Sequence, residues 1–105
     1  MIMNLEQMQN AQKIMKDKNG SFFATIFHID LCNDMGEDDA TVTITALNDG
    51  FLVHYLRSES GVFNDEFDCR IIDEYKREMN CEQLLDYLVF HQLVSDFEGY
   101  LKTIA

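Results

Sequence analysis

The sequence predicts an α+β fold: an N-terminal helix, an antiparallel sheet of three to four strands, and one or two C-terminal helices packed on one face. Apolar residues recur at intervals of three and four at both ends of the chain, whereas they alternate with polar residues in its middle. Short turn signals separate the alternating segments, and short links join antiparallel strands. Because 105 residues is the size of one domain, residues 1–105 are expected to share a single core.

The first segment carries the start and stop signals of a helix. Asn4 is a favourable N-cap, and Gln7 follows at the spacing of a capping box. Asn19 and Gly20 should end the helix, because glycine accepts the left-handed conformation that closes many helices. Apolar residues at helical spacing lie between these signals: Leu5, Met8, Ala11 and Met15.

Alternation predicts the first two strands. Residues 21–32 are apolar on both faces near their start, which is typical of a central strand or of one covered on both sides. Residues 33–39 are expected to form a loop that turns at Gly36. Residues 41–47 place Val, Ile and Ala on one side and Thr on the other, as expected of a half-exposed antiparallel strand.

Turn signals bound the remaining strands. Residues 48–50, Asn-Asp-Gly, predict a hairpin whose primed turn uses positive φ, with residues 51–57 as the returning strand. Residues 58–61, Ser-Glu-Ser-Gly, predict a second turn, followed by a fourth strand over residues 62–71. Asp65 interrupts the alternation of this strand and indicates a bulge or a register irregularity there.

The C-terminal part is expected to be helical. Residues 73–79 resemble a short helix or turn, and Asn80 with Gln83 forms a second capping-box signal. Gly99 weakens the helix interior by about 1 kcal/mol relative to Ala and indicates a kink or an early stop. The apolar stripe comprises Phe90, Leu93, Val94, Phe97, Leu101 and Ile104, and it is widened by Leu84, Leu85, Leu88 and Val89.

An excess of acid dominates the composition. The chain has 19 Asp and Glu against 8 Lys and Arg, a formal net charge of −11. This charge excludes binding to nucleic-acid phosphates and docking on an anionic membrane. No apolar run approaches the roughly 18 residues of a membrane span, and no secretory signal is visible. Three cysteines fit no disulfide scaffold, so free thiols in a reducing cytoplasm are expected.

Metal-binding motifs are absent or incomplete. The residues at EF-hand offsets before Gly36 and Gly50 do not supply the required oxygen ligands, so residues 34–39 are expected to be a solvated acidic loop, with a loose cation site as the lesser alternative. His28, Asp30 and Cys32 would share one strand face, but the sequence offers no fourth zinc ligand. The sequence therefore assigns no metal and no cofactor.

Catalytic motifs are equally weak. The chain has neither a Gly-x-Ser-x-Gly turn nor a glycine-rich phosphate loop. A Cys–His pair could be drawn from Cys69 or Cys81 with His54 or His91, but structural thiols are the expected interpretation, because nothing nearby lowers the thiol pKa. No catalytic residue is assigned, and a non-enzymatic role is expected.

The negative charge is concentrated rather than evenly spread. The first 20 residues carry three Lys against Glu6 and Asp17, so the first helix is slightly basic. If the acidic residues elsewhere converge on one face, they attract a basic partner, whereas dispersed acids would serve solubility. The candidate partner-binding residues form two groups: Asp34, Glu37, Asp38 and Asp39, and then Asp65, Glu66, Asp68, Asp73 and Glu74.

Aromatic residues offer a second signal for an interface. They cluster in the segment expected to form the hairpin: Phe51, Tyr55, Phe63 and Phe67. Most should belong to the core, and any left exposed beside carboxylates would resemble the anchor of an interface with a charged rim.

These observations favour a non-enzymatic inhibitor or adaptor that binds a basic protein. Carboxylates would stand where phosphates sit in a nucleic-acid-binding groove, so the expected partner is a nuclease or a nucleoprotein complex. In composition the chain is similar to phage-encoded antirestriction and anti-CRISPR inhibitors and to immunity proteins against nuclease toxins. One alternative is a small enzyme or ligand-binding domain with a pocket between sheet and helices, lined by His28, His54 or Cys69. Another is a homodimer formed through the sheet edge or the C-terminal helix stripe.

Overall fold

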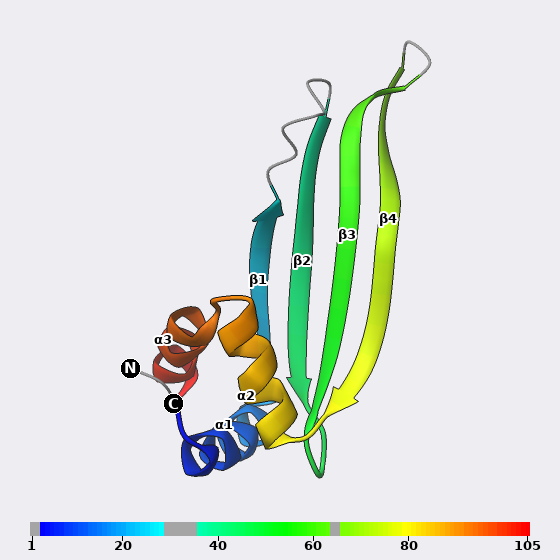
Figure 1. Ribbon diagram of the computed structural model, residues 1–105. Coiled ribbons are helices and arrows are strands. Elements are labelled where there is room, and N and C mark those ends of the chain that lie inside the picture. Colours follow the sequence, from blue (N-terminus) through cyan, green and yellow to red (C-terminus); the bar gives the residue numbers. More distant parts are fainter. Residues whose placement is uncertain (1–2, 29–35, 64–65) are drawn as a thin grey trace.

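The computed structural model describes residues 3–28, 36–63 and 66–105, and the side chains within these ranges except those of residues 27–28, 36–39, 59–63 and 66–70. It confirms the α+β fold, with an N-terminal helix, a four-stranded antiparallel sheet and two C-terminal helices (Figure 1). The elements of the described part are α1 (Leu5–Lys18), β1 (Ser21–His28), β2 (Gly36–Ala46), β3 (Phe51–Phe63), β4 (Glu66–Met79), α2 (Cys81–Phe90) and α3 (Val94–Ile104).

Helix α1 begins at the predicted capping box. The Asn4 side chain accepts a hydrogen bond from the Gln7 backbone N–H, the Gln7 side chain accepts one from the Asn4 N–H, and both are 2.8 Å long. The expected stop is also present, but Asn19 rather than Gly20 takes the left-handed conformation, with φ 51°. Asparagine tolerates this region better than most residues with a side chain. The Gly20 N–H then donates to the Met15 carbonyl and closes the helix.

The four strands form a meander in the order β1-β2-β3-β4, and each neighbouring pair is antiparallel. All three helices cover one face of the sheet at the end where β1 begins, and the other halves of β2, β3 and β4 extend beyond them (Figure 1). Alternate strand residues such as Ile44 and Val53 are fully buried under the helices. The molecule is consequently elongated, with dimensions of 50 × 25 × 23 Å.

Strand β1 lies at an edge of the sheet, so the prediction of a central or doubly covered strand is wrong. Phe22 is buried and packs edge-on against Phe97, with 5.2 Å between ring centroids. Phe23 points to the opposite face and is 62% exposed. The two-sided apolar pattern misled because the helices cover only one of the two faces.

The predicted hairpin after β2 is present, but its turn differs. Residues 47–50 form a four-residue connection in which the Leu47 N–H donates to the Gly50 carbonyl at 2.8 Å. No residue of this turn has a positive φ, so the expected primed turn is wrong. Glycine is required at position 50 for a different reason: a Cβ there would lie 2.6 Å from the Met79 carbonyl oxygen.

Two other turn or loop predictions are wrong because the strands are longer than expected. Strand β3 continues through residues 58–61, and β2 already begins at Gly36. The register of β3 and β4 shifts between Arg57 and Ser58, opposite residues 71–73, where β4 carries one extra residue. The irregularity expected at Asp65 lies outside the described residues.

Residues 73–79 form the end of strand β4 and not the expected short helix or turn. They pair with β3 from Arg57 to Phe51, and alternation turns Tyr75 and Met79 towards the helices, where both are partly buried. A spacing of four residues brings side chains to one side in a helix and in a strand alike, so these two positions could not separate the alternatives. The pairing with β3 decided the outcome.

The C-terminal stripe is divided between two helices. Asn80 caps α2 through the predicted box with Gln83, and Gln92, with φ 58°, separates α2 from α3. Phe90 is 79% exposed and so does not belong to the buried stripe, while α3 continues through Gly99 without a stop. The buried members of the predicted stripe are Leu84, Leu88, Leu93, Phe97 and Leu101.

Two glycine-to-alanine substitutions should have opposite effects on stability. Gly50→Ala should lower the free energy of unfolding by about 1–3 kcal/mol, because the new methyl group collides with the Met79 backbone. Gly99→Ala should raise it by up to about 1 kcal/mol, because no atom lies within 4 Å of the new Cβ and alanine favours the helix. Urea unfolding measures both, and a shift of the same sign in the two variants would contradict this account.

Candidate functional site

The strand register brings the two predicted acidic groups to the same end of the sheet. Residues 37–39 of β2 lie opposite residues 58–60 of β3, while Glu66 and Asp68 of β4 lie opposite Phe63 and Gly61 of the same strand. The two groups therefore flank one stretch of β3 on its two sides, with backbones about 10 Å apart. The predicted members Asp34 and Asp65 lie outside the described residues.

A further acidic residue, Glu59 of β3, lies between these groups. Its backbone is in register with Asp38 of β2 on one side and with Arg70 of β4 on the other. Sequence reasoning missed it because residues 58–61 were expected to form a turn. We call this part of the sheet the acidic end: Glu37, Asp38, Asp39, Glu59, Glu66, Asp68, Asp73 and Glu74, together with Arg57 and Arg70.

The predicted residues Asp73 and Glu74 mark the border of the acidic end nearest the helices. Both are exposed, and as consecutive strand residues they project from opposite faces of the sheet. Glu74 lies on the face away from the helices, where its Oε2 is 3.5 Å from Nε2 of His54. Asp73 is in register with Arg57 on the helical side. At this border the carboxylates therefore occur on both faces of the sheet.

An aromatic cluster joins the helices to the strands beside this border. The rings of Tyr55 in β3 and Tyr75 in β4 stack with centroids 4.7 Å apart. The Tyr75 and Tyr87 hydroxyl groups share a hydrogen bond of 2.8 Å, which ties β4 to α2. The Arg77 guanidinium lies over the Tyr75 ring, 4.6 Å from its centroid. These contacts hold the long strands at the place where they leave the helical layer.

The cluster keeps the Tyr87 hydroxyl group neutral. Burial raises the pKa of Tyr87 most, and the hydrogen bond to Tyr75 raises it further. The neighbouring Tyr75 and Tyr55 hydroxyls add to the shift, whereas Arg77 lowers the pKa of Tyr87 by a smaller amount. An ionised Tyr87 hydroxyl here would be poorly solvated, so the tyrosine cluster has a structural role and not a proton-transfer role.

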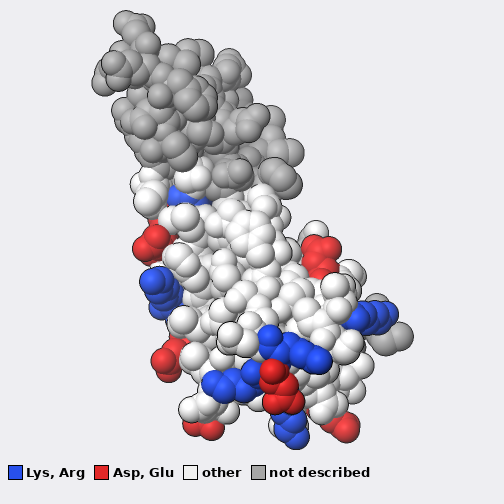
Figure 2. Space-filling model, turned by 180° about the vertical axis from the view of Figure 1, so that it is seen from behind, with Lys and Arg blue, Asp and Glu red and all other residues white. Residues whose placement is uncertain are grey.

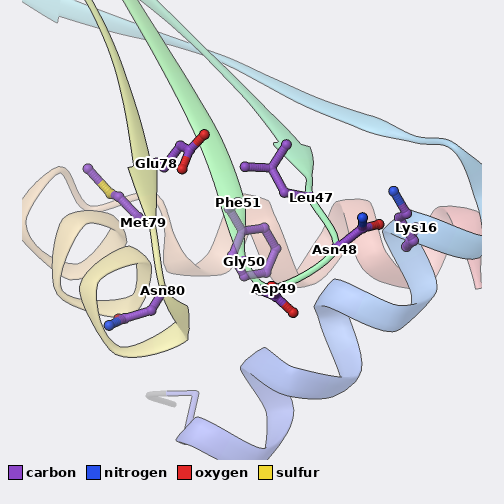
Figure 3. Close-up of a pocket in the computed structure, with 9 residues that line it drawn as sticks. All are labelled: Lys16, Leu47, Asn48, Asp49, Gly50, Phe51, Glu78, Met79 and Asn80. Carbon is purple, nitrogen blue, oxygen red and sulfur yellow. The ribbon is translucent and has the colours of Figure 1, made fainter.

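A pocket of about 470 Å³ lies at the opposite end of the sheet (Figure 3). Gln12 of α1 donates a hydrogen bond to the Leu47 carbonyl nearby and fixes the helix against the turn. The lining residues come from the end of α1, the turn after β2 and the end of β4: Lys16, Leu47, Asn48, Asp49, Gly50, Phe51, Glu78, Met79 and Asn80. They offer charged and amide groups for a polar ligand but neither His nor Cys.

This pocket does not contain the groups expected of an enzymatic pocket. His54 lies instead on the face of the sheet that the helices leave open, and the side chains of His28 and Cys69 lie outside the described residues. A second pocket, of about 340 Å³, lies between α1 and α3 and has a mainly apolar lining that includes Met3, Ile14 and Leu101. Neither pocket gathers a nucleophile with a general base.

The described cysteine and histidine side chains form no reactive pair. Burial raises the pKa of the Cys81 thiol, which disfavours the nucleophilic thiolate. His91 packs against the Tyr87 ring, 4.4 Å between centroids. Among the side chains that the structure describes, no cluster of three or more His, Cys, Asp or Glu is suited to a metal ion. The strand face of His28, Asp30 and Cys32 falls outside the described residues and side chains.

The predicted aromatic signal is divided. Phe51 and Tyr55 are buried in the core, and the side chains of Phe63 and Phe67 lie outside those described.

In the part of the chain that the structure describes, no helix has the length and apolarity needed to cross a bilayer. Comparison of the chain with protein-family models, curated proteins and solved structures found no match.

Substitution of Tyr87 tests the neutral hydroxyl group. Because burial raises the folded-state pKa, Tyr87 should remain protonated at pH values where exposed tyrosines ionise, near pH 10. Native wild type and Tyr87→Phe should therefore show the same rise in tyrosinate absorbance up to about pH 11. In urea, the wild type should ionise one tyrosine more than the variant.

The same shift fixes the sign of a pH dependence. The stability contributed by neutral Tyr87 is complete below the unfolded-state pKa of about 10 and is lost as the pH rises above it. The stability of Tyr87→Phe should therefore fall less steeply in this alkaline range. A smaller native absorbance rise in the variant would contradict the assignment.

Proposed function

We propose that the protein is a non-enzymatic inhibitor or adaptor that binds a basic protein through the acidic end of its sheet. The observation that carries the proposal is the register of β2, β3 and β4, which brings the predicted acidic groups to the two sides of one stretch of β3. Eight acidic residues and two arginines occupy this end among the described strand positions. Their summed field attracts cationic surfaces.

The distances support a collective effect of these charges. Neighbouring strands lie about 4.8 Å apart, and residues two apart on one strand are separated by about 6.8 Å. Both spacings are below the Debye length of about 10 Å at 0.1 M salt, so the charges act together on an approaching partner. The strands of this end also extend beyond the helices, so the helices cover neither face of the sheet there (Figure 1).

The chemistry of the partner follows from the charge. A groove that binds nucleic acid is lined with Lys and Arg, and a projecting strand end with closely spaced carboxylates presents the same sign of charge as a phosphate backbone. We therefore propose a nuclease or a nucleoprotein complex as the target, with action in the cytoplasm. The similarity in composition to phage-encoded inhibitors and nuclease-immunity proteins is consistent with this role.

Charge reversal tests the proposal. We expect Asp38→Lys, Asp39→Lys, Glu66→Lys and Asp68→Lys together to abolish capture of a basic nucleic-acid-binding protein from a lysate of the native host or its target cell. The reversed end would repel the partner and slow association by about 10-fold or more. Wild-type capture should weaken with rising salt and with added DNA.

A matched variant controls for the change in net charge. Asp17, Asp49, Asp86 and Glu98 lie away from the acidic end, and their combined reversal to Lys changes the net charge equally. This control should retain the partner. Equal recovery by both reversed proteins, or capture that is insensitive to salt, would refute a binding role for the acidic end.

A further inference from the structure

Next to the helices, the face of the sheet that they leave open is uncharged over three of its four strands, and on β2 the charge begins only at Asp39. In register, three rows of residues cross this face: Ser21, Thr45, Leu52 and Glu78; Phe23, Thr43, His54 and Lys76; Thr25, Thr41, Leu56 and Glu74. In these rows β1, β2 and β3 contribute no Asp, Glu, Lys or Arg, whereas every β4 residue is charged. Figure 2 shows the result as a broad white surface with a column of acidic and basic side chains along one side.

This face has the composition of an interface core. Charged residues are depleted from such cores, and aromatic residues are enriched. Phe23 is 62% exposed near one edge, while Leu52 and Leu56 are only partly buried. In a chain with a net charge of −11, three consecutive rows without charge on β1, β2 and β3 form an uncommon surface.

We propose that this face is the interface of a homodimer in which two copies stack open face against open face with their strands antiparallel. A two-fold axis across the strands places β4 of one copy against β4 of the other. When the axis passes between the Thr43 row and the Thr41 row, Lys76 of each copy faces the partner's Glu74. These charged side chains of β4 in one copy then face opposite charges on β4 of the other copy.

The ends of the molecule favour the same arrangement. Lys16 of α1 lies beside the turn after β2, and Lys18 follows at the end of that helix. Figure 2 shows basic side chains below the white surface, with acidic side chains among them. The antiparallel stack lays this lysine end over the partner's acidic end, whereas a parallel stack would place acids against acids. Charge complementarity thus selects a second copy in one orientation.

The contact area sets the expected affinity. Four strands at about 4.8 Å spacing and about eight residues of length, which includes the three rows and the next row with Asp39, give a footprint of roughly 500 Å² per copy. The total of roughly 1,000 Å² lies at the lower limit for a specific interface. We therefore expect a reversible dimer that dissociates on dilution. This inference does not depend on the proposed function.

A pair of charge-reversed variants tests the interface. Lys76→Glu places Glu against the partner's Glu74 twice, and Glu74→Lys places Lys against the partner's Lys76 twice. Sedimentation over a wide concentration range should find wild type in a monomer–dimer equilibrium and each variant alone at least tenfold weaker. An equimolar mixture should recover the dimer, because both cross-contacts pair Glu with Lys. Misfolding cannot produce this recovery.

Two phenylalanine variants locate the surface. Phe23→Asp should abolish the dimer, because it introduces charge into the uncharged part of the contact, where β1 of one copy faces β1 of the other. Phe90→Asp is the matched control: Phe90 is more exposed but lies on α2, on the opposite side of the sheet, and its substitution should leave the dimer intact.

Three outcomes would overturn the inference: a wild-type monomer at every concentration, a mixture that fails to recover the dimer, or equal effects of the two Phe variants. Capture of a basic protein by a monomeric wild type would leave the proposed function standing.

Discussion

Burial of one face of the sheet beneath three helices is the interaction on which the rest of the structure depends. Phe51 and Val53 of β3 are fully buried against Met15 of α1, Leu88 of α2 and Phe97 of α3 in one core. No polar or charged residue of the described part is buried, so this core is stabilised by apolar burial and close packing. Because the described helices cover only one face of the sheet and only part of its length, its other face and its far end extend beyond this layer.

The distribution of charge follows from this arrangement. A carboxylate buried without a partner costs several kcal/mol, so a strongly acidic chain must place its acids where no layer covers them. Strands β3 and β4 extend past the helices and supply such a place at the acidic end. The stacked Tyr55 and Tyr75 rings and the hydrogen bond to Tyr87 secure the strands where the cover ends.

Local signals identified the helix starts and the cleanest strand but failed where pairing decided the structure. The capping boxes of Asn4 and Asn80 are complete within four residues, so the sequence alone reveals them. Residues 58–61 contain turn-forming amino acids, yet they continue β3 because strands pair with them on both sides. Residues 73–79 likewise extend β4 because β3 lies beside them.

By itself the sequence determined the α+β class, the helix caps, the alternation of β2 and the two groups of acidic residues. Only the tertiary structure decided that these groups flank one stretch of β3, that Glu59 lies between them, and that β1 is an edge strand with Phe23 exposed. The physical reason is that caps and alternation depend on neighbours along the chain. Strand order and register depend instead on contacts between distant segments, and the burial of one face selects among them.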